Sequence, residues 1–182
     1  MSNTQKNGAA PIAGASTGAL NLGPYFIQHK IGSHDVLDVR GAVTDKNTKV
    51  ISFGLKTSDN LNQQWQFVPA GPETPGWWYL QSLMKSGDDN FVMSLEPNTT
   101  VEPKPIVMLP KGATKADHQL WSLQSTEELG YWYIQSKYSA ANSVTPLVIG
   151  LTGIEAKSQA VAGALSFTEF EKQAWGFRPV DL

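Results

Sequence analysis

The sequence predicts an all-β fold assembled from three copies of one unit, because a short motif recurs at a nearly constant period. The motif is a glutamine, any residue and a tryptophan, and successive tryptophans lie 56 and 54 residues apart. Its copies are Gln63–Trp65, Gln119–Trp121 and Gln173–Trp175. Self-similarity at a fixed period indicates one supersecondary unit that packs against its own copies.

A second repeated motif marks where each copy begins. It starts with glycine, ends with glutamine, and its starts lie 53 and 54 residues apart. Its copies are Gly23–Gln28, Gly76–Gln81 and Gly130–Gln135. Large apolar side chains occupy alternate positions, which is the spacing of a strand with one face inward. These starts predict repeats at residues 23–75, 76–129 and 130–182.

Further strands are predicted from apolar runs bounded by turn residues. One run is equivalent in the three copies, at Val36–Val39, Phe91–Leu95 and Leu147–Leu151. The alanines of Ile154–Leu165 would also suit a helix, but the equivalent segments, 49–55 and 105–111, have strand-like sequences. We therefore favour a strand in all three copies.

The number of strands and the repeat period together predict how the chain closes. About four short strands in each copy give about twelve, and no copy can bury its inward face alone. Three copies of about 53 residues that close around an axis form a β-trefoil, a barrel without free sheet edges. The recurring aromatic rings are expected in its core. These are Trp65, Trp121 and Trp175, together with Trp78 and Trp132.

Composition argues against several partners and locations. The net charge is −2 and no basic run occurs, so nucleic acid is not an expected partner. The chain has no cysteine, which fits a reducing compartment. Residues 1–22 are rich in Gly, Ala, Ser, Thr and Asn and lack the hydrophobic region of a secretory signal. We expect a flexible N-terminal tail there, a cytoplasmic location and no membrane insertion.

No catalytic or metal-binding motif is apparent. His29, His34 and His118 occur singly, without a second ligand at metal spacing. Glycoside hydrolysis would need a pair of carboxylates, and no motif points to such a pair. The sequence therefore predicts a protein that is not an enzyme and that needs no cofactor or metal.

The threefold Gln-x-Trp pattern resembles that of the ricin B-type (R-type) lectins, over residues 23–182. The cysteine-free, signal-free form is most similar to the cytosolic fungal members. The resemblance implies a non-catalytic carbohydrate-binding protein for galactose- or GalNAc-type glycans of glycoproteins or glycolipids, with a role in defence. A single shallow site binds weakly, with a Kd on the order of 1 mM. Avidity would then require a homo-oligomer or clustered glycans.

The resemblance also implies site residues, because R-type lectins build each sugar site within one repeat. Their site uses an aspartate, an aromatic residue twelve positions before the motif's tryptophan, and an asparagine before its glutamine. The first repeat matches with Asp38, Phe53 and Asn62, and Gln63 is expected to brace the site. A carboxylate can accept two sugar hydroxyls, a ring can pack on the sugar's apolar face, and an amide can bond a hydroxyl. One departure is Ile51, where family members often have a polar residue.

The other two repeats lack this combination. Their equivalent positions are Ser94, Leu109 and His118 in the second repeat, and Gly150, Gly163 and Lys172 in the third. Neither set contains a carboxylate or an aromatic platform for sugar stacking. One working site of the R-type is therefore expected.

Two other functions remain open. A trefoil protease inhibitor would act through exposed loops, and the proline-rich segments Ala70–Pro75 and Glu96–Pro105 are candidates. Such inhibitors generally lack the Gln-x-Trp pattern. A cytoskeletal or scaffolding trefoil that binds only protein is the third alternative.

Overall fold

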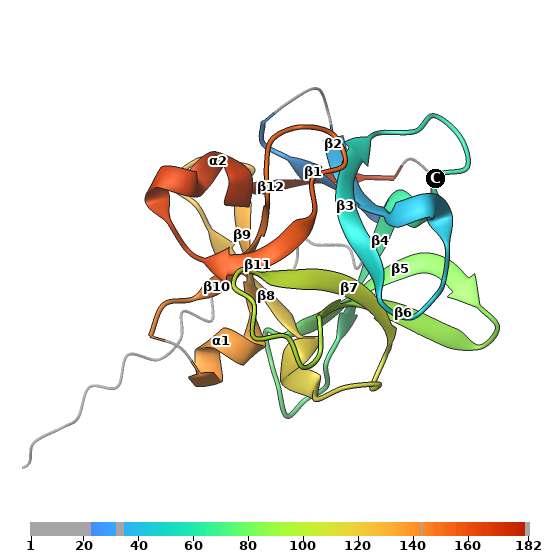
Figure 1. The fold of residues 1–182 in the computed structure, drawn as a ribbon, viewed down its shortest axis with the longest axis horizontal. Coiled ribbons are helices and arrows are strands. Elements are labelled where there is room, and N and C mark those ends of the chain that lie inside the picture. The colour runs from blue at the N-terminus through green and yellow to red at the C-terminus, as the bar shows by residue number, and fades with distance from the viewer. Residues whose placement is uncertain (1–22, 32–34, 143, 181–182) are drawn as a thin grey trace, which may run out of the picture.

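The computed structural model is all-β and describes residues 23–31, 35–142 and 144–180 (Figure 1). Within them the chain forms one sheet of twelve strands. The strands are β1 (Tyr25–His29), β2 (Asp35–Val39), β3 (Thr48–Gly54), β4 (Gln64–Pro69), β5 (Trp78–Ser86), β6 (Asp89–Leu95), β7 (Lys104–Pro110), β8 (Trp121–Ser125), β9 (Trp132–Ser136), β10 (Leu147–Leu151), β11 (Ala160–Ala164) and β12 (Trp175–Pro179). The tail predicted at residues 1–22 and the lone His34 lie outside the described residues.

Helical structure is limited to short segments. These are α1 (Lys137–Asn142), α2 (Phe170–Gln173) and the 3₁₀ turns η1 (Arg40–Ala42), η2 (Leu61–Gln63), η3 (Ala116–His118) and η4 (Phe167–Glu169). In Figure 1, α1 and α2 lie at the periphery of the strands. Among the described residues, no helix has the length and apolar composition needed to cross a membrane.

Six strands close into a ring. Going round it, β1 pairs with β12, and β9, β8, β5 and β4 follow before β4 pairs with β1 again. The other six strands form the hairpins β2–β3, β6–β7 and β10–β11. The hairpins meet one another through β3, β7 and β11. This is the threefold arrangement of a β-trefoil, and its closed ring leaves no free sheet edge.

The segment around Ile154–Leu165 is a loop followed by a strand, so a helix there would be wrong. Residues of β11 pair one to one with β10, from Leu147 opposite Ala164 to Leu151 opposite Ala160. Alanine favours helices in isolation, but pairing with a neighbouring strand and burial decide the conformation here. Ala160 and Ala162 are fully buried and belong to the core cluster.

The tryptophans of the three Gln-x-Trp motifs lie in the core, as predicted. Trp65, Trp121 and Trp175 are at most 1% exposed. Each indole Nε1–H donates to a backbone carbonyl, with bonds to Leu37, Met93 and Ile149 of 3.0, 3.1 and 2.8 Å respectively. The three acceptors lie on β2, β6 and β10. In each unit, the indole hydrogen bond of the motif therefore links the start of the last strand to the second strand.

Trp78 and Trp132, also predicted in the core, are only partly buried, and Trp78 packs against the core cluster. Tyr25 stands at the equivalent position of the first repeat and is 5% exposed. Its ring lies 6.1 Å from the rings of both Phe67 and Phe177, which are themselves 5.4 Å apart, so the three rings form one cluster. Trp78 meets Phe67 edge-on at 6.3 Å, from the side of this cluster. Phe67, which contacts Tyr25, Trp78 and Phe177, is thus the central ring of the cluster.

A glutamine outside the repeat pattern joins the three units. Gln159 Nε2 lies 3.0, 3.1 and 3.1 Å from the carbonyl oxygens of Val50, Ile106 and Ala160. Each acceptor stands fifteen residues before the motif's tryptophan in its own unit, so the three are equivalent. Their strands are β3, β7 and β11. A single amide therefore serves three symmetry-related carbonyls where the units meet.

We expect Gln159→Leu to lower the free energy of unfolding by about 1–3 kcal/mol, because leucine has similar volume but cannot donate to the three carbonyls. Urea denaturation measures the change. The matched control is Gln124→Leu, since Gln124 is exposed and makes only a 3.4 Å contact with Ser122. Equal midpoints for the two variants would contradict a stabilising role for Gln159.

Candidate functional site

The four predicted site residues come together, and two of them, Asp38 and Phe53, line the same cavity. Asp38 lies on β2, Phe53 on β3, and Asn62 and Gln63 on η2 immediately before β4. A cavity of about 420 Å³ opens beside the β2–β3 hairpin. Its lining consists of Asp38, Arg40, Gly41, Ile51, Phe53, Lys56 and Lys157.

Asp38 is the best-supported polar group of the cavity. Its carboxylate Oδ2 accepts hydrogen bonds from Asn62 Nδ2 at 2.8 Å and from Gln63 Nε2 at 2.9 Å. Lys56 Nζ lies 3.8 Å from the same oxygen. The other carboxylate oxygen has no hydrogen-bond partner among the described residues. Asp38 is only 3% exposed, yet it lines the cavity, so this one oxygen is left for a ligand.

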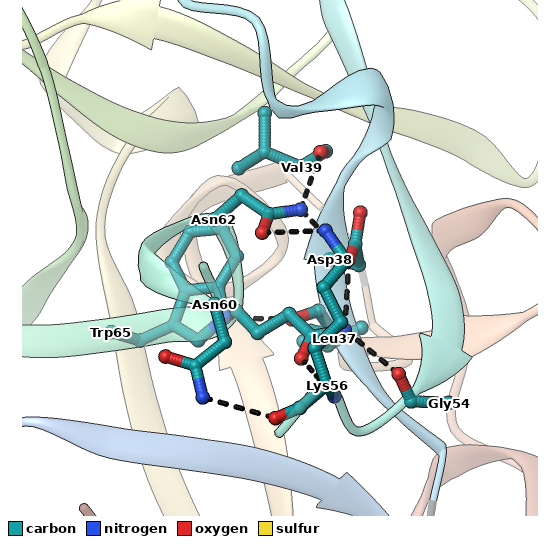
Figure 2. Close-up of polar contacts among 9 residues, drawn as sticks. Leu37, Asp38, Val39, Gly54, Lys56, Asn60, Asn62 and Trp65 are labelled. Atoms are coloured by element: carbon teal, nitrogen blue, oxygen red, sulfur yellow. Dashed lines mark hydrogen bonds and ion pairs between the residues drawn. The ribbon is translucent and has the colours of Figure 1, made fainter. Parts of the chain in front are cut away.

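Asn62 supports Asp38 and has no spare hydrogen-bonding group. Figure 2 shows its amide between Asp38 and Val39. Its second Nδ2 bond goes to the Val39 carbonyl at 3.1 Å, and its Oδ1 accepts from Lys56 Nζ at 2.9 Å. The residue is 2% exposed and does not line the cavity beside Asp38. The expectation that Asn62 contacts a sugar hydroxyl is therefore replaced by a positioning role.

Gln63 has the bracing position that the sequence predicts. Besides Asp38, its Nε2 donates to the Gly54 carbonyl at 3.0 Å, and its Oε1 accepts from the Lys56 backbone N–H at 2.9 Å. All of these groups belong to the protein, and the side chain is fully buried. Gln63 thus ties the end of β3 to the carboxylate and leaves nothing to contact a ligand.

The equivalent glutamine makes the same backbone contacts in the other units. Gln119 Nε2 donates to the Pro110 carbonyl, and Gln173 Nε2 donates to the Ala164 carbonyl, at 3.0 and 2.8 Å. The group that replaces Asp38 differs. In the second unit Gln119 donates to the Ser94 hydroxyl at 3.0 Å, and in the third the position is Gly150, which offers no side chain. The glutamine is therefore structural, and only the first unit places a carboxylate in front of it.

The aromatic positions also differ between units. Phe53 is partly exposed and lines the cavity, whereas the equivalent Leu109 is buried and the third equivalent is Gly163. At the asparagine position, His118 packs against Tyr138 and Lys172 pairs with Glu169. At these equivalent positions, neither unit combines a carboxylate with an accessible ring.

Burial raises the pKa of the Asp38 carboxyl above the ordinary aspartate value. The hydrogen bond from Gln63, the charge of Lys56 and the hydrogen bond from Asn62 act in the opposite direction but do not cancel it. The negative charge of Asp38 is thus poorly solvated, and new hydrogen-bond donors in the cavity would stabilise it.

Five further residues of the cavity, Ile51 among them, were not among the predicted site residues. Arg40 and Gly41 follow β2, and Lys56 follows β3, so all three are close in sequence to predicted ones. Lys157 is different because it comes from the β10–β11 loop of the third repeat. Matching the family's site pattern within a single repeat of the sequence could not have identified Lys157. Ile51, the apolar departure from the family pattern, stands opposite Asp38 in the β2–β3 pair and lines the cavity.

The lining is suited to binding a polar molecule with one apolar face. It offers a carboxylate oxygen, the Phe53 ring and Ile51 within one concave surface. Among the described lining residues Asp38 is the single carboxylate, whereas glycoside hydrolysis uses two. No group of three His, Cys, Asp or Glu side chains in the described part of the chain could hold a metal ion.

Comparisons with known proteins reveal similarity in structure. No family model and no curated relative matches the sequence. The designed threefold-symmetric protein ThreeFoil is 21% identical, with a TM-score of 0.65 over 87% of this chain and 99% of that chain. The C-half of the earthworm R-type lectin, solved with GalNAc, is 14% identical, with a TM-score of 0.58 over 85% of this chain and 96% of that one.

A third similar structure is the Polyporus squamosus lectin bound to a sialylated, human-type influenza-binding epitope. It is 18% identical, with a TM-score of 0.67, and the match covers 87% of this chain and 49% of that chain. At these identities the likeness establishes the fold. The chain therefore has the all-β, β-trefoil architecture that its strand pairing already indicates.

Proposed function

We propose that this protein is a non-catalytic lectin that binds galactose- or GalNAc-type glycans through one site in its first repeat. The observation that carries the proposal is the environment of Asp38. Its carboxylate is held by Asn62 and Gln63 through one oxygen, while the other oxygen is free of partners among the described residues, in a cavity beside Phe53.

In the proposed binding mode, some residues of the site contact the sugar and others hold those residues in place. Neighbouring sugar hydroxyls donate to the Asp38 carboxylate, which makes charge-assisted hydrogen bonds. The C–H face of the sugar packs on the Phe53 ring. Asn62, Gln63 and Lys56 keep the carboxylate in place, since their own polar groups are used within the protein. A rigid scaffold reduces the entropy lost on binding.

The similar structures support the choice of ligand class. The names of the earthworm and Polyporus squamosus lectin structures mention GalNAc and a sialylated galactose-containing trisaccharide. A single shallow site gives a Kd on the order of 1 mM. We propose that clustered glycans on glycoproteins or glycolipids, or assembly of several copies, raise the avidity. The resemblance to cytosolic fungal lectins supports a defence role and a cytoplasmic location.

A resin assay tests the proposal directly. We expect the protein to be retained on immobilised lactose or GalNAc and to elute with the free sugar. Resin carrying mannose is the control for non-specific adsorption. Absence of retention on every sugar, together with inhibition of papain-like or trypsin-like proteases, would instead support a protease inhibitor that acts through exposed loops.

We expect sugar affinity to fall as the pH is lowered, and to begin falling at a higher pH than an ordinary aspartate would allow. Burial raises the pKa of Asp38, so its carboxylate is protonated earlier during acidification. A protonated carboxyl loses its charge and half of its acceptor capacity, and binding is therefore present above the raised pKa and lost below it. Calorimetric titration with lactose at several pH values measures this.

Near-UV circular dichroism at each pH serves as the control for an intact fold. Affinity that stays constant to below the ordinary aspartate pKa would show that binding does not depend on the Asp38 charge.

A further inference from the structure

The cavity beside Asp38 has the opposite charge balance from the whole chain. The chain carries a net charge of −2. The charged residues of the cavity lining are Asp38, Arg40, Lys56 and Lys157, one acidic and three basic. This concentration of positive charge is local, because the sequence contains no basic run. A cavity lined mainly by one sign of charge attracts ligands of the other sign.

Two of the three cations are not neutralised by the protein. Lys56 is engaged, since its Nζ donates to Asn62 at 2.9 Å and lies 3.8 Å from Asp38. Arg40 and Lys157 are exposed, and neither side chain forms a hydrogen bond or an ion pair within the described residues. A neutral sugar whose hydroxyls bind Asp38 would leave both charges unused.

The backbone holds Lys157 at the cavity although it belongs to the third repeat. Its N–H donates to the Ser52 carbonyl at 2.8 Å, and the Ser52 N–H donates to the Ser158 carbonyl at 2.9 Å. The Ser52 hydroxyl also bonds the Glu155 carbonyl at 3.3 Å. These bonds fasten the β10–β11 loop to β3, next to Phe53. The Lys157 ammonium lies 5.9 Å from the centroid of the Phe53 ring.

The acidic residue of the same loop does not offset Lys157 at the cavity. The carboxylate of Glu155 lies against Gly153 and is not part of the cavity lining. A ligand on the Phe53 ring would therefore meet the Lys157 ammonium at one rim and the Arg40 guanidinium after β2, with Asp38 deeper in the wall.

We propose that the cavity prefers galactose-type sugars that carry an anionic group, either a sulfate ester or a carboxylate, which Lys157 and Arg40 bind at the rim. The inference rests on the proposed lectin function and specifies its ligand. The anionic group has to point away from Asp38, because two like charges in contact repel each other. The uncharged hydroxyls of the same sugar face Asp38, and its apolar face packs on Phe53. The site is then shared between the first and third repeats.

Exposed charge pairs contribute modestly, so we expect the acidic sugars to bind roughly fivefold more tightly than the neutral one at low salt. Screening should reduce this advantage between about 50 mM and about 500 mM salt. The measurement is calorimetric titration with lactose, with lactose sulfated on its galactose and with lactose sialylated on its galactose. A preference for one acidic sugar identifies which anionic group the rim accepts.

The variants Lys157→Gln and Arg40→Gln remove one charge each, and both are expected to bring the affinity ratio of acidic to neutral sugar towards one. Lys115→Gln is the matched control, because Lys115 is exposed and lies in the second repeat, outside the cavity lining. Its ratio should equal that of the unmodified protein.

Binding of lactose without any preference for either acidic sugar would overturn this inference and leave the lectin function standing. If the protein binds none of the three sugars, both the anionic preference and the lectin function are overturned. A preference for acidic sugars that persists in Lys157→Gln and in Arg40→Gln would rule out these two cations as its cause.

Discussion

Asp38→Asn is expected to abolish measurable binding of galactose-type sugars. The substitution keeps the shape of the side chain but removes its charge and turns one acceptor into a donor. Hydrogen bonds to charged groups are worth about 1.5–3 kcal/mol each. The whole affinity of a millimolar site is only about 4 kcal/mol, so the loss of two such bonds leaves nothing to detect. Retention on lactosyl resin and calorimetric titration both measure the effect.

The stability of Asp38→Asn should stay close to that of the unmodified protein. The asparagine keeps an oxygen to which Asn62 and Gln63 can donate, and removal of a buried charge relieves its desolvation. Equal urea midpoints would show that lost binding does not reflect lost folding. Asp88→Asn is the matched control, because Asp88 is exposed in the second repeat, and it should bind normally. Full affinity in Asp38→Asn would place the sugar site elsewhere.

Trp121→Ala is expected to lower the free energy of unfolding by about 3–5 kcal/mol, which is the usual effect of removing a large buried ring. Trp121 is 1% exposed, and its Nε1 donates to the Met93 carbonyl at 3.1 Å. Alanine would leave a cavity and an unpaired buried carbonyl. Urea denaturation monitored by the fluorescence of the remaining tryptophans measures the loss.

Trp121→Phe separates the two contributions, because it keeps most of the ring and loses only the indole hydrogen bond. Relative to the unmodified protein, a decrease of about 1 kcal/mol is expected for the loss of that bond. Because Trp121 lies outside the proposed sugar site, Trp121→Phe should still bind lactose with normal affinity. A fully folded Trp121→Phe that fails to bind would mean that the motif tryptophans contribute to binding as well as to the core.

The repeat pattern predicted much of the fold because it reports the same burial three times. Trp65, Trp121 and Trp175 recur at one position and make one equivalent hydrogen bond each. Comparison with the equivalent segments also gave the correct strand at Ala160–Ala164, where alanines alone suggest a helix. The repeat boundaries and the site itself stay predictions.

Prediction was weakest where the three copies differ or where one copy contacts another. Trp78 and Trp132 were expected in the core because they recur, but both are partly exposed, whereas Tyr25 at the equivalent position of the first copy is buried. Asn62 was expected to face a sugar because of its residue type and place in the motif. Its neighbours Lys56, Asp38 and Val39 use all of its polar groups.

The sequence by itself determined the β-trefoil class, the core tryptophans and the restriction of the carboxylate–aromatic pair to Asp38 and Phe53. Each of these is carried by spacing along the chain, either within one repeat or between successive repeats. Only the tertiary structure decided that Gln159 joins the three units and that Lys157 of the third repeat stands beside Phe53 of the first. Closure of the barrel brings residues about one hundred positions apart into contact, and no local pattern encodes which loop arrives at which site.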